Sequence, residues 1–429
     1  MARKKKDNDE LIKKGKKAYK KAVKKHGKEK VLTVLLLLIL IGGGIFFFLV
    51  YKGYISLEKP SHKPADAVTG VTYDDFQIHF MELGNKYNGD STYIKAGDTD
   101  ILIDAGSRKD SAEHHKAYLD QYVTDGKFEY VIATHADQDH ISGFVGNKDG
   151  DTRTGLLYQY EVDTLIDFAL SNKTSKTYME YLDAVDYLVS KGTKHYTAAE
   201  CFDEKNGAKK SYKLSDNASM DILYNKYYFE KDNDENNYSV VTLFNYMDKK
   251  FLLTGDLEKE GEEAMAEYYK SHEGLGHVDL FKAGHHGSKT SSNDVLLELI
   301  TPDISTVCCC AGAAEYTNYN NNTFPTQDYI NRISKYTDQV YAITYWDEAA
   351  KEYKSLNGTI IVSTNGSDVA VAATNNTTKL KDSAWFNEEI YIDSKGRFKS
   401  DNDITLDPFN AKTPGVTKVP RRVWPGANA

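Results

Sequence analysis

The sequence predicts an α/β domain that is tethered to a membrane by one N-terminal helix. Residues 31–51 form a run of 21 residues without a charged side chain. Further along, short apolar segments alternate with stretches of helical periodicity, and several of the apolar segments end directly in His or Asp. With the N-terminal run and the polar C-terminal residues set aside, the remainder fits one large α/β unit with an ample core.

The apolar run has the length and the flanks of a membrane anchor. At about 1.5 Å per residue, its helix would span about 31 Å, which matches a hydrocarbon core. Residues 1–30 hold 14 Lys or Arg against 4 Asp or Glu, and this excess predicts a cytoplasmic N-terminus and an extracellular domain. A cleaved signal peptide is the alternative. Its apolar region should be shorter, however, and the small-x-small site at residues 65–67 lies well past the run.

The rest of the chain divides into three parts. Residues 52–72 contain two prolines and mixed charges and are expected to form a juxtamembrane linker. Residues 73–365 form the expected α/β domain, with helices around residues 111–124 and 174–191. Residues 366–429 are expected to form a C-terminal extension. Beyond about residue 380, where the pattern fades into Lys, Asn, Asp and Pro, this extension is expected to be an irregular tail that is packed on the surface or disordered.

Potential metal ligands are concentrated in the run His135-Ala136-Asp137-Gln138-Asp139-His140. The apolar residues before it, 130–133, predict a buried strand, so the ligands would stand at a strand end that faces solvent. His135 and Asp137 can project together from an extended chain, while Asp139 and His140 can turn toward a neighbouring ion. Imidazole and carboxylate ligands suit Zn²⁺, with Mn²⁺ or Fe as alternatives.

Two further strand ends supply residues of the same kinds. Residues 251–254 form a short apolar segment that ends in Gly255-Asp256, and residues 280–283 lead into His285-His286. Adjacent side chains of an extended chain point to opposite sides, so we expect one histidine to be a ligand and the other to touch substrate or support the ligands. Three such strand ends are much more specific than any one of them.

Together these motifs resemble the metallo-β-lactamase superfamily, and the His285-His286-Gly287-Ser288 variant resembles in particular the hydrolase domain of the ComEC/Rec2-type competence proteins. The resemblance covers roughly residues 74–365. It implies an αββα sandwich with a binuclear metal centre at one edge. The resemblance implies that His135 and Asp137 hold the first ion and that Asp139 and His140 hold the second. Asp256 would bridge the two ions. His285 would complete the ligands of the second ion, with His286 as its rival.

The chain departs from the family pattern at three places. The least of them is Ser142-Gly143, where the family usually has Gly-Gly after the metal motif. No histidine stands where the true lactamases supply the third ligand of the first ion, so this site is expected to be completed by water or weakly occupied. Phe324 stands where the competence proteins often have a histidine, which puts a substrate role at that position in doubt.

The implied chemistry is hydrolysis of a phosphodiester. Two divalent ions can share a hydroxide, lower its pKa toward neutrality and neutralise charge on a phosphoryl oxygen. Asp139 is expected to steer that hydroxide or accept its proton, and His286 to protonate the leaving oxygen. Ser288, Lys289 and Ser291 are candidate donors to a phosphate, although an ordinary polar loop explains them equally well.

Charge limits the substrate. The whole chain carries −9 and residues 1–30 contribute +10, which leaves about −19 for residues 31–429. Such a surface is a poor general binder of nucleic acid, so a small phosphoester or an envelope phosphodiester fits better than DNA. Two alternatives stay open. They are a carbonyl-directed hydrolase (lactonase, thioesterase or lactamase) and a non-catalytic metal-binding component of an envelope or DNA-uptake assembly.

Two other features carry little chemistry. Cys308, Cys309 and Cys310 lie in an apolar run that predicts a buried strand, and three consecutive cysteines do not have a zinc-ribbon spacing. Residues 232–237 resemble a calcium loop only loosely, because the required Gly and Glu are missing, and they are expected to form a solvated turn.

Overall fold

The computed structural model describes residues 63–150, 152–314, 318–399 and 415–425, all of them within one unit, Lys63–Ala429. The predicted membrane anchor, residues 31–51, and the basic segment before it lie outside the described residues. Within the described ranges, no helix combines the length and the apolar character needed to cross a membrane. The anchor therefore stays a prediction.

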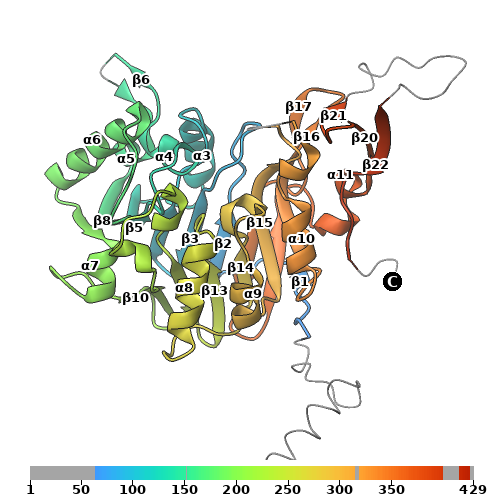
Figure 1. Cartoon of the computed structure of the whole chain (residues 1–429). Helices are drawn as coiled ribbons and strands as arrows, with labels where there is room; N and C mark the ends of the chain where they lie inside the picture. Colours follow the sequence, from blue (N-terminus) through green and yellow to red (C-terminus); the bar gives the residue numbers. More distant parts are fainter. Residues whose placement is uncertain (1–62, 151, 315–317, 400–414, 426–429) are drawn as a thin grey trace, which may run out of the picture. The chain divides into compact units, whose positions relative to one another are not determined.

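Two β-sheets form the centre of this unit (Figure 1). The first sheet is antiparallel from β19 to β4 and parallel from β4 to β9. In spatial order its nine strands are β1 (Val68–Thr69), β19 (Val369–Ala373), β18 (Ile360–Thr364), β2 (Phe76–Phe80), β3 (Thr92–Ala96), β4 (Thr99–Ile103), β5 (Lys127–Ile132), β8 (Glu161–Asp167) and β9 (Lys194–Thr197).

The second sheet has eight strands and is parallel from β13 to β16. Its order is β10 (Ser211–Lys213), β11 (Ala218–Ile222), β12 (Thr242–Tyr246), β13 (Lys249–Leu253), β14 (Leu280–Lys282), β15 (Ile304–Ala311), β16 (Val340–Asp347) and β17 (Glu352–Ser355). Every residue of β15 is buried, so the prediction that the three consecutive cysteines belong to a buried strand is confirmed. Strands buried on both faces are typical of parallel sheets that are covered by helices.

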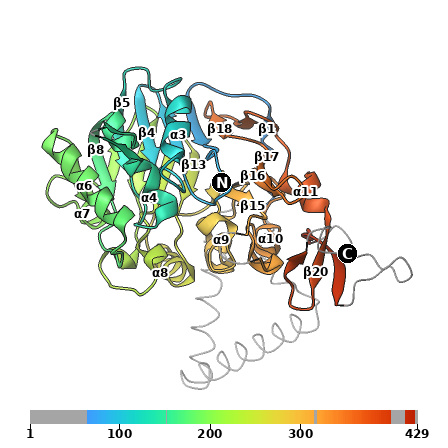
Figure 2. The same cartoon turned by 90° about the horizontal axis from the view of Figure 1, so that it is seen from above.

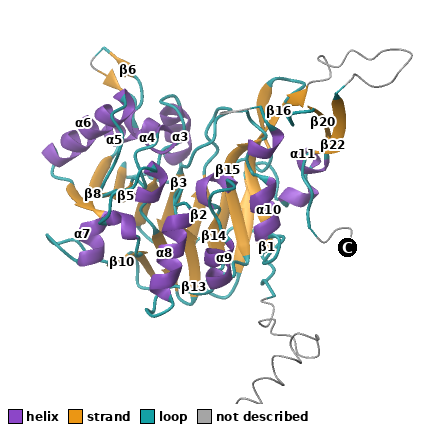
Figure 3. Ribbon diagram, viewed as in Figure 1, coloured by secondary structure: helices purple, strands orange, loops and turns teal. Residues whose placement is uncertain are grey.

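Helices cover the outer face of each sheet, which gives four layers (Figures 2 and 3). On the first sheet lie α3 (Ser111–Leu119), α4 (Gln138–Val145), α5 (Leu156–Gln159) and α6 (Lys176–Ser190), and on the second lie α8 (Lys259–Tyr269), α9 (Asp294–Ile300) and α10 (Gln327–Ile333). A short helix, α7 (Ala198–Asp203), follows β9. The helix predicted over residues 174–191 is confirmed. Apolar residues at helical spacing form a stripe along it, and Tyr181, Val185 and Leu188 of this stripe are buried.

The inner faces of the two sheets share one apolar core. Phe76 of β2 stacks on Phe251 of β13 with ring centroids 5.2 Å apart, and both rings are fully buried. Such burial removes about 25 cal/mol of unfavourable hydration per Å² of apolar surface. The core therefore fixes the position of one sheet relative to the other, and with it the distance between the strand ends that carry the site residues.

The chain beyond residue 365 is more ordered than the sequence predicts. The boundary expected at residue 365 falls inside the β18–β19 hairpin, since β19 belongs to the first sheet. After it come α11 (Ala384–Asn387) and a three-stranded sheet of β20 (Glu389–Asp393), β21 (Phe398–Lys399) and β22 (Val416–Pro420). An irregular or disordered tail is therefore wrong for the described residues of this segment. Between α4 and α5, a short hairpin is formed by β6 (Lys148–Asp149) and β7 (Thr152–Arg153).

Candidate metal centre

The predicted metal-ligand run spans the junction between β5 and α4. β5 ends at Ile132, and Asp137 is the N-cap of α4, with an extended backbone. Asp139 and His140 therefore stand in the first turn of the helix, while His135 lies in the loop before it. The positive end of the helix dipole favours carboxylates at this place.

Three strand ends converge on this junction, as the sequence predicts. Asp256 follows β13, and His285 and His286 follow β14 in the turn Gly284–Gly287. These strands and β5 point the same way within the parallel parts of the two sheets, so their carboxyl ends meet at one edge of the sandwich. Ligand sites in α/β proteins are commonly found at such an edge.

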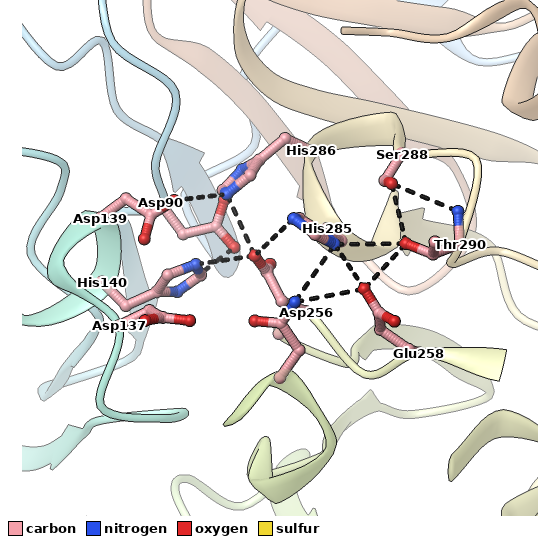
Figure 4. A network of polar contacts seen from close by, with 12 residues as sticks. Asp90, Asp137, Asp139, His140, Asp256, Glu258, His285, His286, Ser288 and Thr290 are labelled. Atoms are coloured by element: carbon pink, nitrogen blue, oxygen red, sulfur yellow. Dashed lines mark hydrogen bonds and ion pairs between the residues drawn. The ribbon is translucent and has the colours of Figure 1, made fainter. Parts of the chain in front are cut away.

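Four side chains form a compact buried group: Asp139, His140, Asp256 and His286 (Figure 4). One atom from each lies within 4.8 Å of all the others. His140 Nε2 and His286 Nε2 each lie 3.1 Å from Asp256 Oδ2, and His286 Nε2 lies 3.4 Å from Asp139 Oδ2. Two ligand atoms that each bind a tetrahedral ion at about 2.1 Å are about 3.4 Å apart. The group therefore has the spacing of a four-ligand metal site.

The hydrogen bonds around this group also fit a metal ion. His140 Nε2 and His286 Nε2 are buried and have no hydrogen-bond partner, although their other ring nitrogens do. His140 Nδ1 lies 2.7 Å from Asp104 Oδ2, and His286 Nδ1 lies 2.9 Å from the carbonyl oxygen of Cys308. A histidine that donates from Nδ1 presents the lone pair of Nε2 to an ion. The donor set of two imidazoles and two carboxylates suits Zn²⁺, Mn²⁺ or Fe.

Asp104, which the sequence analysis did not select, holds several parts of the site together. Its Oδ1 accepts the backbone N–H of Thr134 at 2.8 Å, and its Oδ2 accepts the Thr134 hydroxyl at 2.7 Å in addition to His140. Asp104 follows β4, the strand beside β5. An Asp that ends a strand next to the ligand-bearing strand is a usable sequence signal only when the strand order is known.

Asp90 and Lys282 form a second buried layer that the sequence analysis also missed. Lys282, at the end of β14 and 2% exposed, pairs with Asp90 and lies 3.5 Å from Asp256 Oδ1. Its Nζ also donates to the carbonyl oxygen of Gly255 at 3.2 Å. Although burial alone would lower the pKa of Lys282, the two aspartates raise it. The lysine therefore stays charged and neutralises part of the negative charge behind the metal-ligand group.

His135 and Asp137 lie beside the four-residue group but do not complete a second one. His135 Nε2 is buried without a hydrogen-bond partner and lies 3.6 Å from Asp137 Oδ2. No third His, Cys or carboxylate joins this pair within 4.8 Å in the part of the chain that the structure describes. The other carboxylate oxygen of Asp137 pairs with Lys173, which lies in the loop between β8 and α6. A fixed positive charge at this place weakens the attraction of the pair for a divalent cation.

Of the two adjacent histidines, the rival ligand His286 rather than His285 joins the four-residue group. His286, expected to be catalytic, lies in the four-residue group, whereas His285, expected to be the ligand, is 18% exposed and lies 3.9 Å from Asp256 Oδ2. His285 Nδ1 lies 3.0 Å from Glu258 Oε1. The backbone explains the difference, because both histidines have positive φ, 45° and 54°, and do not alternate as they would in an extended chain.

The three predicted phosphate donors, Ser288, Lys289 and Ser291, do not lie together at one place in the structure. Ser288 is buried, and its Oγ lies 2.8 Å from the Thr290 hydroxyl, which donates to Glu258 at 2.8 Å. Lys289 instead donates to Asn322 Oδ1 at 3.1 Å. Ser291 is fully buried, and a Cβ at Gly284 would approach its Cβ to 3.0 Å. Of the three residues, Ser288 is joined to the polar network of His285, which Figure 4 shows.

Residues 232–237 are less solvated than the sequence predicts. Glu235 and Asn237 are buried. Glu235 accepts the backbone N–H groups of Ala136, at 3.3 Å, and Asn172, at 2.6 Å. This turn therefore ties the loop of the metal-ligand run to the loop that carries Lys173.

Charge is strongly concentrated at the four-residue group. Burial alone would raise the pKa of Asp256, but His140, His286 and Lys282 hold it well below its usual value. Burial alone would likewise lower the pKa of His286, but Asp256 and Asp90 raise it well above its usual value. Each ionised form is stabilised only by its partners, and a divalent cation would replace the protons on the two histidines.

Comparison with protein families agrees with this geometry. Residues 84–146 and 234–311 match the family model of the metallo-beta-lactamase superfamily. These ranges contain Asp90, Asp104, the metal-ligand run and all residues at the ends of β13 and β14. These two segments therefore resemble a metallo-β-lactamase domain. This match, together with the four-residue group, supports a metal-dependent hydrolase.

The domain resembles those of the ComEC/Rec2-type proteins, which confirms the resemblance seen in the sequence. Recombination protein 2 of Haemophilus influenzae is 32% identical over 106 residues, which are 25% of this chain and 12% of that protein. ComE operon protein 3 of Bacillus subtilis is 27% identical over 128 residues, 30% of this chain and 15% of that protein. The chain thus matches less than a sixth of the length of either relative.

Two solved structures match the chain at low sequence identity. The metallo-beta-lactamase fold protein YhfI of Bacillus subtilis has 10% identity and a TM-score of 0.34, and the match covers 62% of this chain and 96% of that one. The short form of human tRNase Z has 12% identity and a TM-score of 0.31, with 62% and 93% covered.

Proposed function

We propose that this chain is a membrane-anchored extracellular phosphodiesterase that depends on divalent metal ions. The four-residue group carries the proposal, because its two orphaned imidazole nitrogens and two carboxylates suit Zn²⁺ above all, with Mn²⁺ or Fe as alternatives. His135 and Asp137, with Asp256 shared between the sites, are the residues that would hold another ion. Because Lys173 neutralises Asp137, we propose that this ion binds more weakly.

The proposed chemistry divides between the ions and the protein. Such ions, when bound, lower the pKa of a water molecule and neutralise charge on a phosphoryl oxygen. Asp139 lies at the edge of the group, where its carboxylate can orient the attacking water or accept its proton. His285 is partly exposed and hydrogen-bonded to Glu258, so we propose that it, rather than His286, donates the proton to the leaving oxygen.

An anionic substrate is supported by the position of Lys173. This side chain is 32% exposed and lies beside Asp137, and Figure 4 shows Asp137 and His285 on opposite sides of Asp256. A phosphodiester bound between them could accept a hydrogen bond from the lysine and a proton from the histidine. A carbonyl substrate would have less use for the cation.

The negative charge of the chain favours a phosphodiester substrate that carries few negative charges. About −19 charges on residues 31–429 oppose a long polyanion, so a nucleotide-sized substrate or an envelope polymer with phosphodiester links is preferred. Nucleic acid is the second substrate class, in line with the name of Recombination protein 2. The anchor at residues 31–51 would keep the enzyme beside envelope substrates.

The test is a paired assay of the full chain in detergent, loaded with Zn²⁺ or Mn²⁺. Bis-p-nitrophenyl phosphate reports phosphodiester cleavage, and a chromogenic cephalosporin reports attack on a carbonyl. We expect metal-dependent cleavage of the diester that Asp139→Ala abolishes, while His272→Ala, which removes an exposed histidine stacked on Tyr268, leaves it unchanged.

Two outcomes would contradict the proposal. Cleavage of the lactam alone would support a carbonyl-directed hydrolase on the same scaffold. Silence on both substrates with metal bound would support a non-catalytic component of an envelope or DNA-uptake assembly.

A further inference from the structure

A buried arginine in the C-terminal segment is bonded directly to the loop beside the metal centre. Arg422 is 4% exposed. Its guanidinium donates to the carbonyl oxygens of Pro325 and Thr323, both at 2.8 Å, to Thr323 Oγ1 at 2.8 Å and to Asn320 Oδ1 at 2.7 Å. Among the described residues no carboxylate pairs with it. A buried charge is costly unless its hydrogen bonds are well made, and here four of them hold residues 320–325.

Burial lowers the pKa of Arg422 to about 9, and the neighbouring charge of Arg421 adds to this effect. The arginine is therefore held at this place at a cost in solvation, which an ordinary surface anchor of a C-terminal strand does not require. It also lies outside the two ranges that match the family model.

The loop that Arg422 holds lies against the histidine turn. The ring of Phe324 is 5.6 Å from the ring of His285 and 6.0 Å from that of His286. Next to it, Thr326 donates to the carbonyl oxygen of Gly287 from its N–H at 2.9 Å and from its hydroxyl at 3.1 Å. The loop is therefore enclosed between the guanidinium on one side and the histidines of the site on the other.

The histidine turn needs such support. His285 and His286 both adopt left-handed backbone conformations, and each costs a residue with a side chain on the order of 1–2 kcal/mol. Two in succession persist only when the surroundings determine them. A Cβ at Gly287 would lie 2.9 Å from Pro325 Cβ, so the turn and the loop fit each other with no spare room.

We propose that Arg422 is a positioning residue of the metal centre, which presses Phe324 and Pro325 onto the turn and so fixes His286 as a ligand and His285 beside it. The proposal rests on the metal centre of the proposed function. It assigns the C-terminal segment, including β22, a part in the site. Figure 1 shows β22 and α11 beside α10 at this side of the unit.

The neighbouring residue provides a matched control. Arg421 anchors the same segment through Glu348, at 2.8 Å, and Glu388, at 2.6 Å. Its side chain makes no hydrogen bond to residues 320–325. Arg421→Gln therefore loosens the segment without removing the bonds to the loop, whereas Arg422→Gln removes them, and Arg422→Lys keeps the charge but loses the forked geometry.

The experiment measures Co²⁺ binding to the full chain by the visible spectrum of the bound ion, which reports ligand geometry, together with the dissociation constant. We expect Arg422→Gln to change the spectrum and to weaken binding about 10-fold or more, as removal of a supporting residue commonly does, and Arg422→Lys to restore part of the loss. Arg421→Gln should lower the melting temperature yet leave spectrum and affinity unchanged. Phe324→Ala should reproduce the effect of Arg422→Gln, and the double variant should add little to it.

An unchanged Co²⁺ spectrum in Arg422→Gln, or equal changes in the Arg421 and Arg422 variants, would overturn the positioning role while leaving the metal centre intact. If Arg422→Gln fails to fold, Arg422→Lys and Phe324→Ala decide by the same readouts. Failure of the unsubstituted chain to bind Co²⁺ would overturn the metal centre itself, and this proposal with it.

Discussion

His285 and His286 are adjacent in the chain but have different surroundings at the site. His286 is fully buried, and its Nε2 is directed at Asp139 and Asp256, whereas His285 is partly exposed and bonded to Glu258. In an extended chain they would point to opposite faces, but their left-handed backbones place both near Asp256. Chemical type alone cannot tell them apart, and burial and partners can.

Substitution of each histidine should therefore give a different defect. We expect His286→Ala to weaken metal binding at least 100-fold, because it removes a ligand. His285→Ala should retain the metal and lose about 10²- to 10⁴-fold in kcat, which is the usual contribution of a general acid. Equilibrium dialysis for metal content, together with kcat on a phosphodiester, measures both effects. Loss of metal in His285→Ala with retention in His286→Ala would reverse the assignment.

Asp104 offers a second prediction at this scale. Its carboxylate orients His140 and receives two hydrogen bonds from Thr134. Asp104→Asn keeps the shape but loses the charge, so we expect metal affinity to fall 10- to 100-fold. Asp100→Asn is the matched control, because this buried aspartate of β4 pairs with Lys95 instead. Equal metal affinities for the two variants would contradict the role of Asp104.

The candidate metal ligands could be predicted from the sequence, but the residues that hold them in place could not. The run from His135 to His140 and Asp256 were visible because metal-ligand residues directly follow apolar strands. Asp90, Asp104 and Lys282 were missed, since each acts through a partner that is distant in the chain and adjacent only once the strand order is formed. Lys173 was missed for the same reason.

At the scale of elements, two helices are joined at the site by one buried glutamate. Glu262 of α8 accepts the backbone N–H groups of Ser292, at 2.6 Å, and Asn293, at 2.8 Å, just before α9 begins. The loop from His286 to Ser291 ends at this junction. Burial raises the pKa of Glu262 to about 7, although its hydrogen bonds oppose the shift.

This pKa predicts a pH dependence of stability. An unfolded glutamate titrates near 4.5, so between about pH 4.5 and 7 the folded chain binds one more proton than the unfolded chain. The stabilisation from this group is complete below pH 4.5 and is lost as the pH rises through 7, by up to about 3 kcal/mol. Glu262→Gln does not titrate.

The measurement is urea unfolding of both proteins at pH 5 and pH 8, with a chelator present so that metal binding does not contribute. We expect the free energy of unfolding of the unsubstituted chain to fall relative to that of Glu262→Gln as the pH rises. A difference between the two proteins that is the same at both values would show that Glu262 does not carry the proton.

The elements were predicted where apolar periodicity is strong and missed where it is weak. Residues 174–191 carry a clear stripe and form α6. The strands of the C-terminal sheet are short, and although β20 alternates Glu389, Tyr391 and Asp393 with Ile390 and Ile392, five residues are too few to stand out as a strand among the surrounding polar residues. Its stability comes from partners such as Glu348 and Glu388 on Arg421, which composition does not reveal.

At the scale of the whole molecule, the segment expected to be a linker is partly built into the fold. β1 pairs with β19 at the edge of the first sheet. Before it, the backbone N–H of Ala67 donates to Gln339 Oε1 at 2.7 Å, and Gln339 Nε2 donates to the carbonyl oxygen of Ala65 at 2.6 Å. Gln339 is 3% exposed, so these bonds satisfy a buried amide.

A shortened protein that begins at residue 72 should therefore be less stable than the full chain, whereas one that begins at residue 63 should be equally stable. Protein beginning at Thr72 lacks β1 and leaves the buried amide of Gln339 without two of its partners, which costs on the order of 1–3 kcal/mol. Protein beginning at Lys63 should unfold cooperatively with the melting temperature of the full chain. Gln339→Ala in the longer protein separates the causes, because it removes the same bonds without removing β1. If protein from residue 72 melts at the same temperature as protein from residue 63, residues 63–71 contribute nothing to the stability of the domain and are only the linker that the sequence predicts.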